Sequence, residues 1–526
     1  MGTYLNCGNE AFRMIRRGLY VDKTGLIEYV NNSLGTSRCL TCFSRPRRFG
    51  KSYAAAMLAA YYDKSCDSGE LFEGLEISRS ASYEKHLNTL DVIYLDISWF
   101  VSVSSDIQNV VFDIQENVIE ELQDAFPGYI KRGEKVLANA LLSISQQTKE
   151  KFFIIIDEWD ALFREAKNRE ILQESYIRFL RSLFKGGPAI KSAIAGAYMT
   201  GILPIKKYGT ESALTDFREY SMAKPAKLAG YVGFTEGEVK KLCETYSLDF
   251  ENVRKWYDGY SFHQIKHVYS PHSVMNAIEY GEFGNYWTSS ETYESLVQYI
   301  GMNFDGLKDA VVAMLGGGRI RIDTQSFQND MTSFHSRDDV LTLLIHLGYL
   351  AYDEAAREVY IPNLEVAEAF KLAVQNTGWQ YVAEALKRSD DLLFATIDRN
   401  ADAVAAALER IHSDETSILQ YNDENSLSCA LSIAYYTARN DYTIIRELPS
   451  GKGFADLAFI PVRTDKPALL IELKYNKDAE GAIRQIRDRR YDGVLNHYRS
   501  NLLLVGINYD KESVDKKHTC VIEKFK

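Results

Sequence analysis

Short apolar runs alternate with helical patterns between residues 38 and 200, and this alternation predicts a parallel sheet covered by helices. In the clearest helical stretch, apolar residues recur at three- and four-residue steps from Ile107 until Pro127 and Gly128 stop the pattern. Its apolar stripe should pack on the sheet. The four expected strands are Cys39–Phe43, Val92–Ile97, Phe152–Ile156 and Ala193–Met199.

Helical periodicity replaces the strand pattern after about residue 230, which predicts a second, mainly helical domain. Thr235 followed by Glu238 is a typical helix start. Near the end of this domain a helical pattern precedes two apolar runs that can pair across a polar turn, as in a winged-helix module. No basic cluster marks the start of that helix, so packing is favoured over DNA binding. The three segments are Val340–Leu347, Tyr349–Tyr352 and Val359–Ile361.

The last part of the chain shows the order αβββαβ. The expected elements are a helix from Glu424, strands Tyr442–Glu447, Phe454–Ile460 and Ala468–Leu473, a helix from Ala479 and a strand Leu502–Ile507. The sequence therefore predicts an α/β protein of three domains, over residues 1–230, 231–405 and 406–526.

The composition supports this organisation, because 526 residues with a hydrophobic fraction of 46% suffice for three ordinary cores. The sequence has neither a signal-peptide pattern nor a long apolar run, so we expect a cytoplasmic protein without a membrane partner. Seven cysteines without a paired framework indicate reduced thiols, and Cys39 and Cys42 fit a buried strand better than a metal site. The net charge of −11 still allows a local basic surface that binds nucleic acid.

A basic loop, Arg45–Ser52, lies between the first expected strand and a helix over Tyr53–Tyr62. The start of a helix presents free backbone N–H groups and a partial positive charge to phosphate. Lys51 would reach the β- and γ-phosphates of ATP, and Ser52 would hold Mg²⁺. Arg45 stands where the phosphate-binding pattern GxxxxGK[ST] has its first glycine, so the bare pattern also allows a basic turn.

Two carboxylates make nucleotide binding the favoured interpretation. Asp157 and Glu158 follow the apolar run Phe152–Ile156, where the first carboxylate can orient Mg²⁺ and the second can polarise the attacking water. Thr200 ends the next strand and can point its hydroxyl at the γ-phosphate. With Glu158 as the catalytic base, the predicted ATP-binding residues are Arg45, Arg47, Arg48, Phe49, Gly50, Lys51, Ser52, Asp157 and Thr200.

A second constellation, D-x15-E-x-K, is formed by Asp456, Glu472 and Lys474. Alternation along one strand puts Glu472 and Lys474 on the same face, and an antiparallel neighbour can bring Asp456 beside them. Two carboxylates suit Mg²⁺ or Mn²⁺, and Lys474 would position a water or stabilise charge on phosphorus. Glu424 can add a ligand, and Gln485 can orient the water. The four apolar residues before Glu472 favour a central strand over an exposed charge pair.

The loop Arg45–Ser52 matches in full the RPRRFGK[ST] loop of the AAA-ATPase-like proteins of bacteria, and the chain resembles that family over most of its length. An arginine at the loop's start is that family's form. Further matching stretches are Tyr20-Val21-Asp22-Lys23-Thr24, Asp157-Glu158, Thr200-Gly201, Lys206-Lys207-Tyr208-Gly209, Trp256-Tyr257-Asp258-Gly259-Tyr260 and Tyr269-Ser270-Pro271. The resemblance implies a P-loop ATPase domain over residues 1–230 and a helical lid with a winged-helix-like module over 231–405.

Residues 406–526 resemble the PD-(D/E)XK nuclease domain that is commonly fused to such ATPases. The motif positions correspond to Glu424, Asp456, Glu472, Lys474 and Gln485, and Tyr491 lies near a tyrosine that often follows. The resemblance implies an ATPase domain and a metal-dependent nuclease domain. From this architecture we expect an endo- or exonuclease that acts on DNA under nucleotide control, in defence or mobile-element biology. The alternative is a nucleotide-switched scaffold that binds nucleic acid or protein without cleavage. Expected cofactors are ATP and Mg²⁺ or Mn²⁺, and a homo-oligomer is compatible with either interpretation.

Overall fold

The computed structural model divides into two compact units. The first comprises Met1–Tyr286 and Arg321–Glu365, and the second Trp287–Ile320 and Val366–Lys526. The structure describes residues 2–208, 211–262, 265–287, 292–302, 304–329, 331–377, 379, 386, 388–413, 431, 433–450, 453–462, 466–488, 495–510, 512 and 517–525.

A five-stranded sheet in the order β2-β3-β4-β1-β7 forms the centre of the first unit. All its neighbouring strands pair in parallel, which confirms the predicted sheet. Its strands are β1 (Leu40–Ser44), β2 (Asp91–Asp96), β3 (Phe152–Asp157), β4 (Ile194–Gly201) and β7 (Arg218–Tyr220). Because β4 lies between β1 and β3 and all three are parallel, their carboxyl ends lie at the same edge of the sheet. Ligands of parallel sheets usually bind at this edge.

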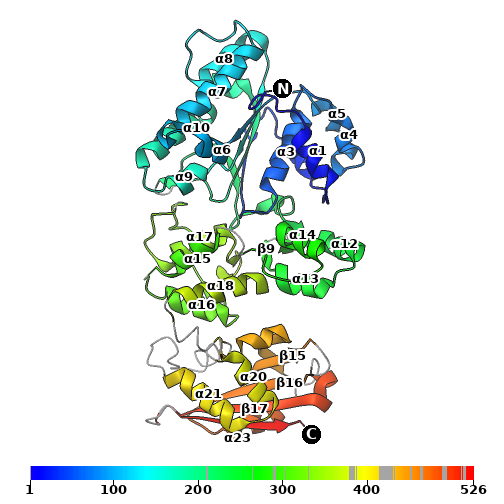
Figure 1. The fold of residues 1–526 in the computed structure, drawn as a ribbon, viewed down its shortest axis with the longest axis vertical. Helices are drawn as coiled ribbons and strands as arrows, with labels where there is room; N and C mark the ends of the chain where they lie inside the picture. The colour runs from blue at the N-terminus through cyan, green and yellow to red at the C-terminus, as the bar shows by residue number, and fades with distance from the viewer. Residues whose placement is uncertain are drawn as a thin grey trace. The chain divides into compact units, whose positions relative to one another are not determined.

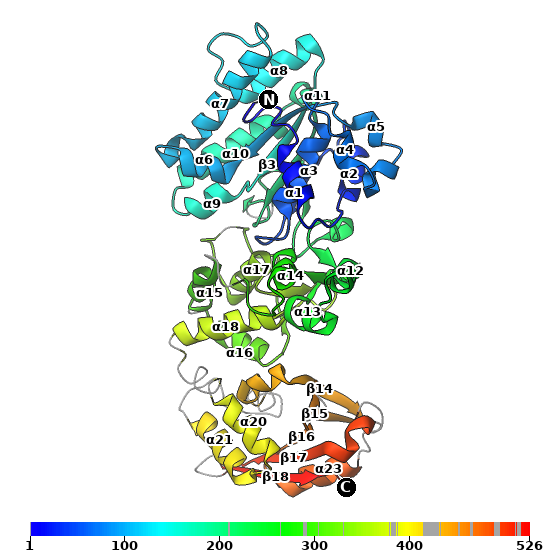
Figure 2. The same ribbon diagram turned by 45° about the vertical axis from the view of Figure 1, so that its right-hand side comes forward.

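Helices cover both faces of this sheet. The helices in this part of the chain are α1 (Glu10–Arg17), α2 (Gly25–Asn31), α3 (Lys51–Tyr62), α4 (Gly69–Phe72), α5 (Tyr83–His86), α6 (Ile97–Val103), α7 (Val110–Ala125), α8 (Leu137–Thr148), α9 (Ala161–Glu165), α10 (Glu170–Phe184) and α11 (Pro188–Ala193). Figures 1 and 2 show α1 and α3 on one face of the sheet and α7, α8 and α10 on the other.

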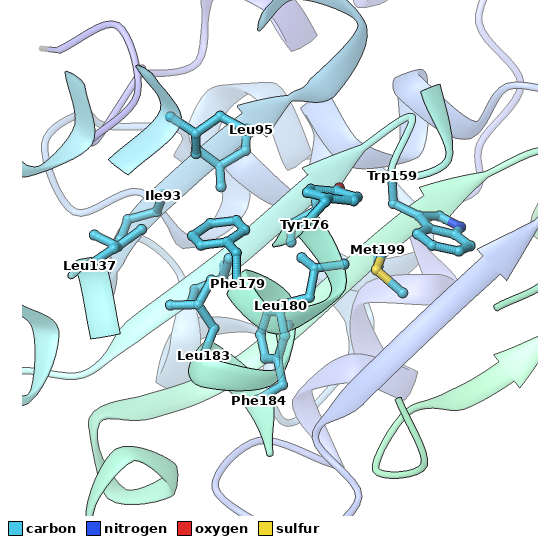
Figure 3. Close-up of a cluster of buried hydrophobic side chains, with 14 of the residues drawn as sticks. Ile93, Leu95, Leu137, Trp159, Tyr176, Phe179, Leu180, Leu183, Phe184 and Met199 are labelled. Atoms are coloured by element: carbon cyan, nitrogen blue, oxygen red, sulfur yellow. The ribbon is translucent and has the colours of Figure 1, made fainter. Parts of the chain in front are cut away.

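The apolar stripe of α10 forms much of the core on that second face. Its side chains Tyr176, Phe179 and Leu183 belong to one buried cluster with Ile93 and Leu95 of β2, as Figure 3 shows. All five side chains are at most 4% exposed. This packing stabilises the sheet from the face opposite α3, because burial of large apolar side chains contributes roughly 1.5–3 kcal/mol each.

A mainly helical segment follows the sheet within the first unit, as the periodicity predicted. Its helices are α12 (Glu236–Tyr246), α13 (Phe250–Tyr257), α14 (Pro271–Tyr280) and α17 (Arg337–Leu347). The expected capping box is present, with the backbone N–H of Thr235 donating to Glu238 at 2.7 Å. The short strands are β5 (Lys207–Tyr208), β6 (Glu211–Ser212), β8 (Phe234–Thr235), β9 (Tyr260–Phe262), β10 (Ile265–Tyr269), β12 (Ala351–Asp353) and β13 (Glu358–Tyr360). Helix α17 followed by the β12–β13 hairpin gives the predicted helix-and-hairpin order.

The second unit contains a mixed five-stranded sheet in the order β14-β15-β16-β17-β18. Strands β16 and β17 pair in parallel, and the other neighbours pair antiparallel. The strands are β14 (Tyr442–Ser450), β15 (Gly453–Pro461), β16 (Ala468–Tyr475), β17 (Leu502–Tyr509) and β18 (His518–Lys524). The strand β18 was not predicted from the sequence, and the expected helix from Glu424 lies outside the described residues.

The remaining helices are α15 (Thr292–Ile300), α16 (Leu307–Leu315), α18 (Leu364–Asn376), α20 (Ser389–Ile397), α21 (Ala401–Ser413) and α23 (Ala479–Asp488), and β11 (Ile320–Arg321) lies at the division between the units. Helix α21 packs on β18 and spans the boundary drawn between residues 405 and 406. The three domain ranges stay predictions. In the described part of the chain, no helix combines the length and apolarity needed to cross a membrane.

The Trp256–Tyr260 motif joins helix α13 to the residues on either side of the β12–β13 hairpin. Gly259 has a φ of 118°, and a Cβ there would lie 2.0 Å from the carbonyl oxygen of Pro362. Tyr260 donates its hydroxyl to the Gly348 oxygen at 2.6 Å, and the side chain of Asn363 donates to the Asp258 oxygen at 2.8 Å. The glycine is therefore required both for its backbone conformation and for this close approach.

We expect Gly259→Ala to lower the free energy of unfolding by about 2 to 4 kcal/mol, because the added methyl collides with backbone in a left-handed conformation. Gly237→Ala is the matched control, since a methyl group on Gly237 in α12 would meet no atom within 4 Å. Calorimetry of both full-length variants measures this effect. The temperature of the first unfolding transition should fall in Gly259→Ala and not in Gly237→Ala. Equal transitions would contradict this role of the glycine.

Candidate functional site

The loop between β1 and α3 has the conformation of a phosphate-binding turn. Gly50 closes it with a φ of 91°, directly before α3 begins at Lys51. That left-handed conformation favours glycine, and the first N–H groups of the helix have no partner within the helix. Gly50, Lys51 and Ser52 all line one cavity, so the helix start faces the space that a phosphate would occupy.

The cavity measures about 940 Å³, which suits a nucleotide. The cations Lys51, Arg47 and Arg48 and the acids Asp157 and Glu158 line it together with apolar side chains. The apolar lining includes Leu19, Tyr20, Val21, Tyr53, Met57, Val101, Phe234 and Met275. The lining therefore offers cations to phosphate and apolar side chains to a flat apolar group.

The buried ammonium of Lys51 bridges the loop and the carboxylates. Its side chain is 3% exposed, and its Nζ donates to the Pro46 oxygen at 3.0 Å and lies 3.8 Å from Glu158 Oε1. Burial lowers the pKa of Lys51, although the charges of Glu158 and Asp157 oppose that shift. The ammonium therefore remains close to a carbonyl and a carboxylate that it can exchange for phosphate oxygens.

Asp157 is held from three directions. It accepts the hydroxyl of Thr200 on β4 and, at 3.1 Å, the hydroxyl of Tyr94 on β2. Burial raises the pKa of Asp157, and the hydroxyls of Thr200 and Ser52 offset part of that increase. The residue is 3% exposed, so its carboxylate is fixed at the end of β3 beside the start of α3.

Glu158 occupies an unusual backbone conformation for a side-chain-bearing residue, with a φ of 53°. Its N–H donates to Asp157 Oδ1 at 3.1 Å and to the Thr200 hydroxyl at 3.3 Å, and its carboxylate pairs with Arg164. Burial alone would raise the pKa of Glu158, but Lys51, Arg164 and Arg47 together lower it. The result is an ionised carboxylate, 20% exposed, that lines the cavity.

The second constellation lies in the sheet of the second unit. Strands β15 and β16 pair antiparallel, with Leu457 opposite Ile471, as the D-x15-E-x-K spacing predicted. Asp456 Oδ2 accepts the backbone N–H of Leu473 at 2.7 Å, which places this carboxylate beside the strand that carries Glu472. The two predicted ligands therefore come from neighbouring strands.

Glu472 is the centre of this group. It is 2% exposed, and its Oε1 accepts the ammonium of Lys474 at 3.2 Å and the side-chain amide of Gln485 on α23. Gly506 of β17 lies opposite Glu472, and a Cβ there would be 2.3 Å from the Ala479 oxygen. The absence of a side chain at Gly506 thus lets α23 approach the sheet closely enough for Gln485 to reach Glu472.

Comparison with known families places each constellation in a recognised domain. A family model described as "Predicted AAA-ATPase" matches residues 6–210, and one described as "PD-(D/E)XK nuclease superfamily" matches residues 423–519. The chain joins an AAA-ATPase-like domain to a PD-(D/E)XK nuclease superfamily domain.

Two solved structures resemble the chain weakly. A Walker-type ATPase of Pyrococcus abyssi has 14% identity over 66% of this chain and 94% of its own, with a TM-score of 0.32. The Aeropyrum pernix ORC2 protein, in ADPNP and ADP complexes, has 13% identity over 68% of this chain and 93% of its own, with a TM-score of 0.23. Scores this low carry no weight for function. The search of curated proteins found no match to the chain.

Two residues predicted to contact ATP are turned away from the cavity of the AAA-ATPase-like domain. Arg45 is fully buried, donates to the oxygens of Ser44 and Tyr220 at 3.1 Å each, and lies over the Phe262 ring. Thr200 is fully buried behind Asp157, to which it donates its hydroxyl. The phosphate contacts expected of Arg45 and Thr200 therefore need correction: one supports the loop and the other orients a carboxylate.

Arg48 and Phe49 line the cavity, and both also contact the mainly helical segment that follows the sheet. Arg48 lies 2.7 Å from His272 Nε2 and donates to the Tyr286 oxygen at 3.3 Å. The ring of Phe49 packs edge-to-face on Tyr260, and the backbone oxygen of Phe49 accepts the N–H of Gly233 at 3.1 Å. The loop of the AAA-ATPase-like domain is thus attached to the helices that follow it.

The sequence interpretation missed Tyr94 and Arg164, which contact the two carboxylates of the AAA-ATPase-like domain. Arg164 follows Asp160 by four residues, a spacing that brings opposite charges together on a helix and was available as a signal. No sequence signal marked Tyr94, because its contact depends on the pairing of β2 with β3.

In the nuclease superfamily domain, the predicted ligand Glu424 and the neighbouring candidate Tyr491 lie outside the described residues. Within the described ranges, no group of three or more His, Cys, Asp or Glu side chains is arranged to hold a metal ion. The donor set that the structure brings together is therefore Asp456 and Glu472, with Lys474 and Gln485 beside them.

Proposed function

We propose that the chain binds and hydrolyses ATP in the cavity beside α3, and that its nuclease domain cleaves DNA with Mg²⁺ or Mn²⁺ under nucleotide control. Defence against foreign DNA or mobile-element maintenance is the proposed setting. The observation that carries the proposal is the meeting of Lys51 with Glu158, at 3.8 Å, inside a cavity lined by a helix start. Such a pair offers a phosphate-binding cation and a base for water at one place.

In the ATP site, each residue has a distinct proposed task. Lys51 would exchange the Pro46 oxygen for phosphate oxygens, while the helix start provides N–H donors. Ser52 and Asp157 would hold Mg²⁺, which neutralises phosphate charge when bound. Glu158 would accept a proton from the attacking water, and the charges of Lys51 and Arg164 lower the pKa of its carboxyl group.

In the nuclease site, Asp456 and Glu472 fit a divalent ion because carboxylate oxygens are the ligands that Mg²⁺ and Mn²⁺ prefer. A bound ion of this kind lowers the pKa of a coordinated water and acts as a Lewis acid. Lys474 would stabilise the charge that develops on the phosphate, and Gln485 would hold the water or substrate in place.

A nucleotide-switched scaffold without cleavage is the second candidate, and one observation favours it. Glu472 Oε1 already accepts both Lys474 and Gln485, and Asp456 accepts a backbone N–H. Hydrogen bonds within the protein therefore position both carboxylates, and the domain does not require a bound metal to stay folded. The two candidates differ in whether the phosphodiester bond is cut.

Incubation of the protein with labelled DNA and RNA separates these candidates. Each substrate is combined with ATP, ADP or no nucleotide, and with Mg²⁺, Mn²⁺ or chelator. We expect cleavage of DNA that requires a divalent ion and changes with nucleotide. Binding without cleavage under every condition would favour the scaffold.

For the ATP site, we expect Glu158→Gln to keep ATP affinity but to lower kcat about 100-fold or more, because the amide cannot accept the proton of water. Glu165→Gln is the matched control, since it removes another carboxylate that lines the same cavity. Phosphate release under single-turnover conditions measures the effect. Turnover of Glu158→Gln at the wild-type rate would assign the base elsewhere.

For the nuclease site, Asp456→Ala and Glu472→Ala should each abolish cleavage, because each removes one of two anionic ligands, while ATP hydrolysis persists. Lys474→Ala should retain or tighten Mn²⁺ binding while cleavage slows, since it removes a positive charge beside the ion.

Isothermal titration with Mn²⁺ beside a cleavage assay tests that contrast between ligand and catalyst. Arg484→Ala, which removes an exposed cation of α23 paired with Asp478, is the control for a change of surface charge. If the Asp456 and Glu472 variants cut as well as the wild type, the assignment of the metal site is wrong.

A further inference from the structure

The side chain of Arg164 on α9 reaches back to the residue that follows β3. Its Nη2 pairs with Glu158 Oε2, and its Nε lies 3.4 Å from Asp160 Oδ2. The guanidinium is 8% exposed and lines the cavity, so it lies between a cavity-facing carboxylate and a fully buried one. The tighter of these two contacts is the one to Glu158.

On the buried side, Arg164 contacts Asp160, whose carboxylate is held by backbone N–H groups. Asp160 is 0% exposed and accepts the N–H groups of Ile202, at 3.2 Å, and Leu203, at 2.9 Å, just beyond β4. Gly201 permits this approach, because a Cβ there would lie 2.7 Å from Asp160 Oδ1. Asp160 is therefore a rigid anchor for Arg164.

On the cavity side, Arg164 contacts the carboxylate of Glu158, which must be oriented toward the attacking water. The backbone of Glu158 is fixed by the N–H bonds to Asp157 and Thr200, but a glutamate side chain keeps its own rotatable bonds. Lys51 lies 3.8 Å from the other oxygen, Oε1, and is the residue that a phosphate would draw away. If Lys51 moves to phosphate, the contact with Arg164 would still hold the Glu158 carboxylate.

We propose that Arg164 is a positioning residue that holds the Glu158 carboxylate in place for the attacking water once nucleotide has engaged Lys51. This inference rests on the proposed ATP hydrolysis. It assigns to Arg164 no contact with the phosphates, because its guanidinium is directed at two carboxylates. A planar guanidinium can hold both at fixed angles, which an ammonium cannot match.

Loss of Arg164 should affect kcat for ATP hydrolysis much more than KM. Arg164→Ala should lower kcat for ATP about tenfold or more and leave KM within about threefold, because a misplaced base slows the chemical step without removing a phosphate contact. Arg164→Lys should recover part of the lost kcat. Arg178→Ala, which removes an exposed arginine from α10, should behave as wild type.

A double-mutant cycle with Glu158→Gln gives the sharpest test. If Arg164 acts through Glu158, adding Arg164→Ala to Glu158→Gln should change the single-turnover rate by less than about twofold. Additive losses, or a large rise in KM with little change in kcat, would overturn the inference and indicate a structural or phosphate-binding role. If Arg164→Ala does not fold, Arg164→Lys enters the same cycle with the same criteria.

The outcome also separates this inference from the proposed function. Wild-type protein that releases no more phosphate than Lys51→Ala would overturn ATP hydrolysis and this inference with it. Wild-type hydrolysis together with an additive cycle would overturn the role of Arg164 alone.

Discussion

The edge of the first unit's sheet where β1, β3 and β4 end depends on a group of oppositely charged side chains that are almost completely buried. Lys51 and Arg164 lie among Asp157, Glu158 and Asp160, and all except Glu158 have side chains at most 8% exposed. Charges removed from water are costly unless they are paired and hydrogen-bonded. The conformation of the loop, the turn after β3 and the end of β4 are therefore linked, because each supplies a partner that another charge requires.

The strand order explains how these partners meet. With β4 between β1 and β3, the end of β4 joins the loop that leaves β1 to the carboxylate that ends β3, because Gly201 accepts the backbone N–H of Arg45 and Thr200 donates to Asp157. The second unit has a different arrangement, and the ligand proposed for it is a cation and not phosphate. There, carboxylates on two antiparallel neighbours can hold a cation, whereas the first unit offers a helix start and an ammonium to phosphate.

Much of this was predictable from local sequence. Apolar runs predicted four of the five strands in each sheet, all except β7 and β18, and the Arg45–Ser52 motif predicted the loop. The errors concern contacts between segments distant in sequence. Arg45 donates to the oxygen of Tyr220 in β7 and lies over the ring of Phe262, and the motif alone carries no information on either contact. Thr200 lies at the expected strand end, but a buried carboxylate beside it takes its hydroxyl. The short strand β18 lacks a strong period-two pattern, so its pairing with β17 shows only in the fold.

The central claim is that the cavity beside α3 binds ATP through Lys51, and isothermal titration of Mg²⁺-ATP measures this directly. Wild-type protein should bind, and Lys51→Ala should bind about tenfold or more weakly, because a charge-assisted contact worth about 1.5–3 kcal/mol is lost. Lys131→Ala, which removes an exposed lysine, should bind as the wild type does. Equal affinity of wild type and a folded Lys51→Ala variant would contradict the account.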